Sequence, residues 1–180
     1  QGYVYLVANQ LAVGDGTGNN TTGIFTGATT TVDVATDNTL APADIDAIYA
    51  ATPEDFRAAG AWVMNVDVEN EIRAFGSGTA TARFTVDQTA AGITLLNGKP
   101  VILTDHAPAW DATDGQDILV FGDTQNFVLA QRLGMTLDVI PHLMGANQRP
   151  TGQSGLYAYA RFGSGVVVAN GFRKLKNITS

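Results

Sequence analysis

Apolar residues at the start of the chain recur at the spacing of one helix face. Within residues 3–13 the spacing predicts a helix with Val4, Leu6, Val7, Leu11 and Ala12 on one apolar face. The glycine-rich run 14–18 ends this helix. Residues 19–39 are rich in Thr, Gly and Asn, and they predict a loop with short strand pieces.

Three further helix starts are predicted from capping residues. Pro42 suits the first position of a helix. Thr52 suits the N-cap of a short turn that Gly60 ends, and Asn65 or Asp67 suits the N-cap of a helix that continues through Ala74.

Short apolar runs elsewhere predict strands. Asn97-Gly98 lies between two such runs and favours a tight hairpin, and residues 163–165 (Gly-Ser-Gly) favour a second one. The predicted strands are residues 62–64, 93–96, 101–103, 118–121, 127–130, 137–140, 156–162 and 166–168. Since helices and strands do not alternate as βαβ units, the pattern indicates a mixed α+β fold.

Composition supports a folded chain with few charges. The chain has 180 residues, of which 45% are apolar and 15% charged, against the ~25% charged of ordinary domains. One domain or two small ones are expected, with a surface that suits contact with neighbouring protein copies. The absence of cysteine excludes disulfides, thiolate nucleophiles and cysteine-bound metals.

The charge is acidic overall and unevenly placed. A formal charge of −7 argues against nucleic-acid binding as the main task. No Lys or Arg precedes Arg57, and no Asp or Glu follows Asp138. The basic end comprises Arg149, Arg161, Arg173, Lys174 and Lys176. We expect it to favour head-to-tail contacts between copies, or a weak, sequence-independent contact with DNA.

Two glycine-containing turns resemble phosphate-binding loops only superficially. Residues 14–18 (Gly-Asp-Gly-Thr-Gly) follow a helix, whereas a nucleotide loop follows a strand, so a structural turn with glycines at positive φ is favoured. At Lys99, the following Pro100 replaces the hydroxyl residue that a phosphate loop requires.

Neither the acidic loop nor the histidines show metal-site spacing. Asp111, Asp114 and Asp117 do not match a calcium loop and are interpreted as a solvated acidic loop. His106 and His142 lack a metalloenzyme motif, and a structural role is favoured for His142. We therefore predict no catalytic, cofactor-binding or metal-binding residues, no cofactor, and core or interface roles for the two tryptophans.

Several longer segments resemble the major capsid proteins of tailed bacteriophages. They are residues 14–24 (GDGTGNNTTGI), 64–75 (MNVDVENEIRAF), 97–108 (NGKPVILTDHAP), 117–143 (DILVFGDTQNFVLAQRLGMTLDVIPHL) and 145–176 (GANQRPTGQSGLYAYARFGSGVVVANGFRKLK). Their order across nearly the whole chain carries the resemblance, which implies the Hong Kong ninety-seven type fold.

The resemblance also implies a domain organisation. It places residues 1–29 at the end of the spine helix and the following loop, 30–142 in the axial domain, and 143–180 in the return strands of the peripheral domain. It implies a fragment, cleavage product or partly ordered subunit, because the family's N-terminal arm, extended loop and most of its spine helix are missing.

The function implied is that of a non-enzymatic shell subunit of a tailed phage or prophage. The expected partners are copies of itself in pentamers and hexamers, scaffold or portal proteins, and packaged DNA through a weak contact, with no membrane. The expected location is the virion, after assembly in the bacterial cytoplasm.

Three alternatives stay open at this point. An encapsulin-like compartment has the same fold and encloses protein cargo. A small metal-dependent hydrolase would use Asp105, His106 and His142, and a β-rich adhesion or lectin module would use the Thr/Gly/Asn loops.

Overall fold

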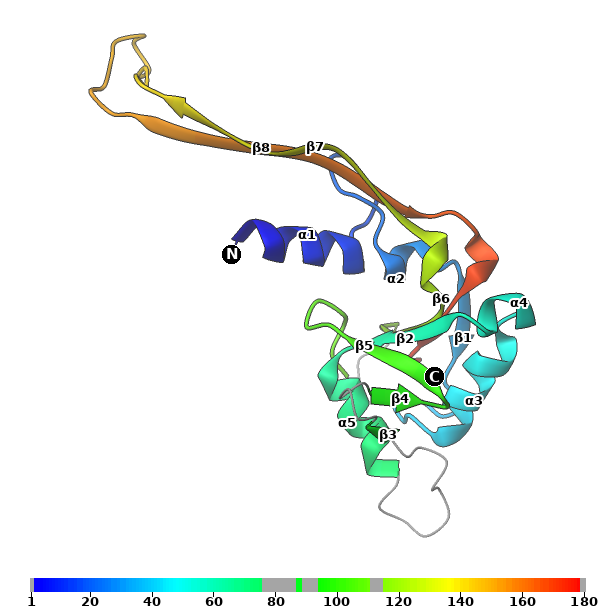
Figure 1. Ribbon diagram of the computed structural model, residues 1–180. Coiled ribbons are helices and arrows are strands. Elements are labelled where there is room, and N and C mark those ends of the chain that lie inside the picture. The colour runs from blue at the N-terminus through cyan, green and yellow to red at the C-terminus, as the bar shows by residue number, and fades with distance from the viewer. Residues whose placement is uncertain (1, 76–86, 89–93, 111–114, 179–180) are drawn as a thin grey trace. The chain divides into compact units, whose positions relative to one another are not determined.

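The computed structural model describes residues 2–75, 87–88, 94–110 and 115–178 and divides into two compact units (Figure 1). The main body comprises residues 1–128 and 164–180, and the hairpin unit comprises residues 129–163. The mixture of helices and strands confirms the predicted α+β class.

The first two long helices begin where the sequence predicts. The predicted helix of residues 3–13 is confirmed as α1 (Gly2–Val13), but of its apolar face only Ala12 is buried, and Val4 and Leu6 are exposed. Helix α3 (Pro42–Ala51) has Pro42 in its first turn. The Asp44 carboxylate accepts the backbone N–H of Ala41 at 2.8 Å and that of Ala35 at 2.9 Å, so it anchors both the helix start and the preceding chain.

The third predicted helix is confirmed as α5 (Val66–Ala74). Asn65 is its N-cap, and the side-chain oxygen of Asn65 accepts the backbone N–H of Asp67 at 3.1 Å. The amide of the same side chain donates to the carbonyl of Ala107 at 2.9 Å, which ties the helix start to the loop after β5 (Lys99–Leu103).

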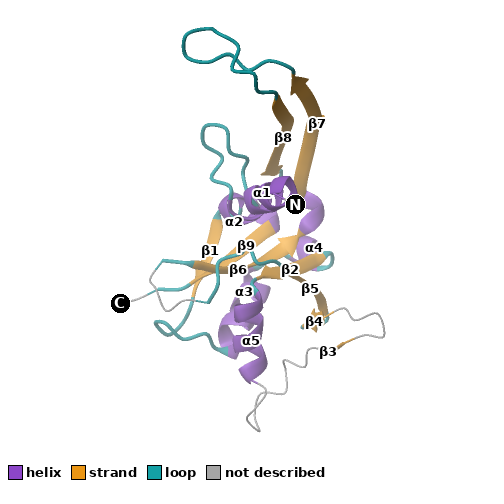
Figure 2. Cartoon of the chain, turned by 90° about the vertical axis from the view of Figure 1, so that its left-hand side faces the viewer, coloured by secondary structure: helices purple, strands orange, loops and turns teal. Residues whose placement is uncertain are grey.

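A seven-stranded sheet forms the centre of the main body (Figure 2). Its order is β1-β9-β6-β2-β5-β4-β3. The β1–β9 and β2–β5 pairs are parallel, and the other pairs are antiparallel. Besides β5, the strands are β1 (Thr30–Asp33), β2 (Gly60–Met64), β3 (Asp87–Gln88), β4 (Thr94–Leu96), β6 (Asp117–Asp123) and β9 (Phe172–Lys176).

The predicted hairpin at Asn97-Gly98 joins β4 to β5. Asn97 has φ 50° and Gly98 has φ 72°, the left-handed conformations that a two-residue hairpin turn requires. Residue 93 of the predicted first strand lies outside the described residues.

The main core lies against β2 and β6, with Trp62 at its centre. Trp62 is fully buried, its ring centroid lies 4.3 Å from that of Phe121, and its Nε1 donates to the carbonyl of Leu96 at 3.0 Å. This confirms the core role predicted for Trp62, because the indole contributes packing and its N–H is satisfied. The buried members of the core are Val34, Leu40, Ile45, Ile48, Trp62, Met64, Val68, Ile72, Leu96, Ile118, Leu119, Phe121 and Leu175.

A second core cluster contains a helix that the sequence analysis missed. Helix α2 (Ile24–Gly27) falls in the segment predicted as loop with strand pieces. Its Ile24 and Phe25 are buried with Val120 and Phe172 from the sheet. Four residues are too few to show helical periodicity, so only tertiary packing reveals this turn.

The predicted cap at Thr52 is wrong. Pro53 occupies the N-cap position of α4 (Glu54–Arg57). The hydroxyl of Thr52 is buried and donates instead to the carbonyl of Ile48 at 3.0 Å. Thr52 therefore closes the preceding helix α3 rather than opening α4.

The predicted short strands near residues 127–140 and 156–168 are also wrong in extent. The structure has two long strands, β7 (Phe127–Ile140) and β8 (Gly155–Val166), which form a separate two-stranded sheet. Residues 131–136 do not end β7, because Leu133 and Met135 continue the alternation of apolar and other residues along one strand. Gly163 and Gly165 lie within β8 instead of forming the predicted turn.

Two short 3-10 helices complete the described elements, at Thr124–Asn126 and Ala169–Gly171. None of the described helices is long and apolar enough to cross a membrane.

Candidate interaction surfaces

The residues considered for metal chemistry do not form a metal site in the described part of the chain. His106 is partly buried, and its ring meets the edge of the Tyr5 ring at a centroid distance of 4.5 Å. His142 is exposed in the loop of the hairpin unit, so the hydrogen-bonded structural role favoured for it has no support. No group of three or more His, Asp or Glu in the described residues could hold a metal ion.

The acidic loop is only partly described. Asp111 and Asp114 lie outside the described residues. Asp117 belongs to β6, where its carboxylate lies 2.8 Å from the Lys174 ammonium. It therefore forms an ion pair with the neighbouring strand β9.

The glycine-rich run after α1 is a self-contained turn. Gly16 and Gly18 have φ of 70° and 60°, which confirms the predicted glycine conformations. The Asp15 carboxylate accepts the Thr17 hydroxyl at 2.7 Å, the Thr17 N–H at 3.1 Å and the Asn20 amide at 2.9 Å. These donors, the Thr17 hydroxyl foremost, lower the pKa of Asp15 to about 2. A phosphate would meet a carboxylate here rather than free donors.

Two residues of the basic end make contacts within the main body. Arg173 is buried, and its guanidinium donates to the carbonyls of Ala51 at 3.2 Å, Asn170 at 3.1 Å and Phe172 at 2.9 Å. Lys174 pairs with Asp117 at 2.8 Å. The expectation that all five basic residues are available to a partner is therefore wrong for these two.

Arg173 also helps to close helix α3. The last turn of α3 has no basic residue of its own. Arg173 binds the Ala51 carbonyl from β9, and Arg57 donates to the Thr52 carbonyl at 2.7 Å and lies 5.1 Å from the centroid of the Tyr49 ring. Both cations lie at the negative end of the helix dipole and stabilise it.

The hairpin unit has no buried residue. Every residue from 129 to 163 is exposed or partly exposed. Its exposed large apolar side chains are Leu129, Leu133, Met135, Leu137, Val139, Ile140, Met144, Leu156, Tyr157 and Tyr159. A two-stranded sheet with so little burial is marginally stable by itself, so this surface needs a partner.

The apolar residues of β7 alternate along the strand. Leu129, Leu133, Met135, Leu137 and Val139 all have odd numbers, so they share one face of the strand. The even positions between them include Arg132, Gly134, Thr136 and Asp138. Alternation of apolar and polar residues with a period of two is typical of a strand with one apolar face. This pattern could have predicted β7 as one continuous strand.

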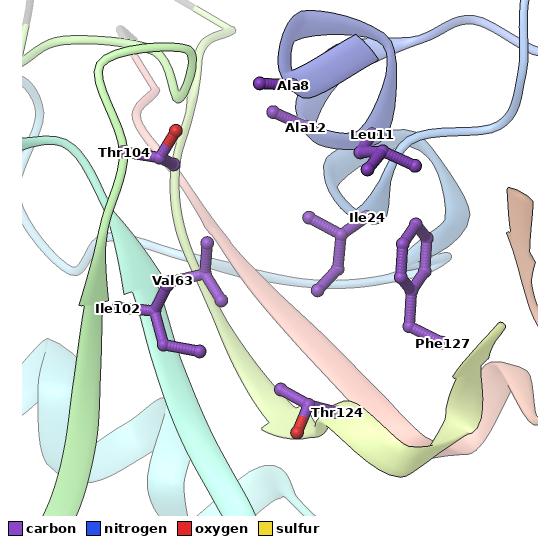
Figure 3. Close-up of a pocket in the computed structure, with 9 residues that line it drawn as sticks. All are labelled: Ala8, Leu11, Ala12, Ile24, Val63, Ile102, Thr104, Thr124 and Phe127. Carbon is purple, nitrogen blue, oxygen red and sulfur yellow. The ribbon is translucent and has the colours of Figure 1, made fainter. Parts of the chain in front are cut away.

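A second apolar surface lies in the main body, between α1 and the sheet (Figure 3). It is a groove of about 320 Å³, and Figure 3 shows Val63 and Ile102 on one side of it and Leu11 and Ile24 on the other. Its lining is Ala8, Leu11, Ala12, Ile24, Val63, Ile102, Thr104, Thr124 and Phe127. Such a lining suits an apolar side chain and provides no titratable group for catalysis.

Comparisons with known proteins identify one family by its sequence model and similar folds among solved structures. The model of the phage capsid family matches residues 1–177. No curated protein matches the chain.

Among solved structures, the capsid of an empty GTA particle is 21% identical, with a TM-score of 0.76, and the match covers 99% of this chain and 63% of that one. The Gordonia phage Cozz structure is 14% identical, with a TM-score of 0.62 and coverage of 97% and 59%. The holo-SrpI encapsulin complex from Synechococcus elongatus PCC 7942 is 14% identical, with a TM-score of 0.54 and coverage of 87% and 56%. The chain thus spans less than two thirds of each of these three proteins.

Proposed function

The chain belongs to the phage capsid family, and we propose on that basis that it is part of the major capsid (head) subunit of a tailed phage or prophage. In this role it is a structural protein that assembles with its own copies into an icosahedral shell around the DNA genome. Its location is then the virion, after assembly in the bacterial host cytoplasm.

The exposed apolar surface of the hairpin unit is the main observation that supports this proposal. This unit exposes an apolar face on β7 and has no buried residue between 129 and 163. A shell subunit requires such a surface, because each copy is covered by several neighbours and weak contacts add up over the whole particle. The groove beside α1 supplies a second apolar contact surface.

We propose no catalytic, cofactor-binding or metal-binding role for any residue. The nearest candidates, Asp105, His106 and His142, belong to no acidic or histidine cluster among the described residues. This supports a structural role over the small hydrolase considered above.

The three-part division at residues 1–29, 30–142 and 143–180 stays a proposal. The two compact units have other boundaries, at 128/129 and 163/164, and β9 pairs with β1 and β6 in the main body. Scaffold and portal proteins, and a weak contact with packaged DNA, stay proposed partners.

Electron microscopy of particles tests the function. The complete reading frame that encodes this chain is expressed and the product is fractionated by size. We expect uniform closed shells that contain this chain. A product that stays monomeric across protein concentrations and with its scaffold present contradicts the proposal.

The contents of the shells separate the two shell functions. Shells that package DNA in infected or induced cells support the phage head. Shells that enclose one cargo protein and no DNA support the encapsulin alternative. The SrpI encapsulin resembles this chain in fold at 14% identity.

A further inference from the structure

The two units of the chain have opposite net charge. The hairpin unit carries three arginines, Arg132, Arg149 and Arg161, against the single acidic residue Asp138, which gives a formal charge of +2. The whole chain carries −7, so the main body carries −9. Because every copy has both units, the hairpin unit of one copy is complementary in charge to the main body of another.

One face of β8 concentrates aromatic rings beside a cation. Tyr157, Tyr159 and Arg161 occupy alternate positions and therefore share a face of the strand. The two tyrosine rings lie 5.6 Å apart with an interplanar angle of 33°, and Tyr157 is 56% exposed. Together with Ala160, the three residues line a hollow of about 390 Å³ within the hairpin unit. We call these three residues the β8 stripe.

The charge of Arg161 is not balanced within its own unit. Arg161 is exposed and forms no ion pair with any described residue, whereas Lys174 and Arg73 each pair with a carboxylate. An exposed guanidinium beside two ordered aromatic rings is the combination that dominates binding hot spots between proteins. It favours a partner that brings a carboxylate to Arg161 and apolar surface to the tyrosines.

We propose that the β8 stripe binds an acidic segment on the main body of a second copy of this chain. The inference rests on the proposed function and specifies one of its contacts. Different surfaces of the two copies meet in it, so it is a head-to-tail contact, and such contacts close into rings when the rotation permits.

A protein partner fits the stripe better than DNA does. Binding to a phosphate backbone needs clustered cations, and the stripe has one. The −9 charge of the main body opposes approach to a polyanion and favours approach to the basic hairpin unit of another copy.

Photo-cross-linking identifies what covers the stripe. Tyr159 is replaced by a benzophenone amino acid in the full chain, and particles are assembled from equal amounts of unlabelled and ¹⁵N-labelled protein. We expect cross-linked peptide pairs that combine the two labels and join β8 to an Asp- or Glu-containing segment of residues 1–128. The proposal is overturned if the two peptides of every cross-linked pair carry the same label, which means that they come from one copy. It is also overturned if β8 is joined to a segment without acidic residues or to nucleic acid.

Charge reversal measures what the contact contributes. We expect Arg161→Glu to lower the yield of particles about tenfold or more, because it places two like charges in a desolvated contact. Arg149→Glu makes the same change in the loop of the same unit and is the matched control, with a yield near that of the wild type. Arg161→Lys keeps the charge and restores part of the yield.

The outcomes separate the two proposals. If the wild-type protein forms no particles, the proposed function fails and this contact with it. If the wild type forms particles and Arg161→Glu forms them equally well, the contact alone is wrong. Unchanged unfolding of Arg161→Glu in denaturant shows that a loss of particles comes from the surface and not from the fold.

Discussion

The strands of the main body and those of the hairpin unit both carry apolar residues, but they use them in opposite ways. In the main body, β2 is buried at all five positions, and Trp62 and Phe121 pack ring against ring. In the hairpin unit, Leu137, Val139 and Leu156 are more than half exposed. The main body therefore buries apolar residues that stabilise its own fold, while the hairpin unit leaves much of its apolar surface exposed.

This contrast teaches that burial within one chain is an incomplete guide to which apolar residues matter. Substitutions in the main body are expected to change the free energy of unfolding of the single chain. Substitutions in the hairpin unit are expected to change assembly.

Replacing the central tryptophan gives the largest expected change. Trp62→Ala leaves a large cavity and an unpaired Leu96 carbonyl, and we expect it to lower the free energy of unfolding by about 3–5 kcal/mol. Denaturant unfolding followed by circular dichroism measures this. Tyr157→Ala, an exposed aromatic in the hairpin unit, is the control, and we expect a change within about 0.5 kcal/mol. Equal losses of unfolding free energy in the two variants would contradict the difference between the buried and the exposed aromatic residue.

Removing the buried arginine tests the basic end. Arg173→Ala leaves three backbone carbonyls without their charged donor, and we expect a loss of about 2–3 kcal/mol in the free energy of unfolding. Arg149→Ala removes an exposed arginine of the hairpin unit and should change stability by less than about 0.5 kcal/mol. If both variants unfold at the wild-type denaturant concentration, Arg173 does not stabilise the end of α3.

Removing the carboxylate at the start of α3 tests a smaller local contribution. Asp44→Ala leaves the N–H groups of Ala35 and Ala41 without their acceptor, and we expect a loss of about 1 kcal/mol. Asp138→Ala, which removes an exposed carboxylate of the hairpin unit, is the comparison. A larger loss for Asp138→Ala than for Asp44→Ala contradicts the anchoring role.

A polar substitution on β7 tests whether the exposed apolar face of the hairpin unit contributes to assembly. Leu137→Ser is expected to change the free energy of unfolding of the single chain by less than about 0.5 kcal/mol, because Leu137 is 58% exposed. It is expected to reduce particle formation, since it removes apolar area from a contact. Gel filtration and electron microscopy measure assembly. A variant that assembles like the wild type shows that this face of β7 stays uncovered.

The smallest expected effect concerns the turn after α1. The folded-state pKa of Asp15 is lowered from 3.8 to about 2 by its hydrogen bonds. The stabilisation from these bonds is therefore fully present above about pH 4 and is lost as the pH falls towards 2. Stability measured from pH 5 to pH 2 should fall less in Asp15→Asn than in the wild type. Identical pH profiles would contradict this assignment.

Local sequence signals located much of the main body. The helix at 3–13, the proline-started helix at Pro42 and the cap at Asn65 follow from periodicity and capping chemistry within a few residues. The hairpin at Asn97-Gly98 follows from the positive φ that these residues tolerate. Two errors in the main body had different causes. The hydroxyl of Thr52 had two local alternatives, and it donates to Ile48 of the preceding helix instead of capping the next one. Helix α2 depends on distant partners, because Ile24 and Phe25 are buried against residues of the sheet.

The candidate surfaces were less predictable than the fold. Arg173 and Arg161 look alike in the sequence, but one is buried against three carbonyls and the other is exposed beside two tyrosines. Burial depends on which strands pair, and no local pattern distinguishes a cation that closes a helix from one left for a partner.

The α+β class, the family and the low share of charged residues follow from the amino-acid sequence alone, because they depend on composition and on the order of local motifs. Which apolar and basic residues are left exposed follows from the tertiary structure. Periodicity tells which side chains share a face, but whether that face is covered depends on long-range pairing, here of β9 with β1 and β6 and of β7 with β8 alone.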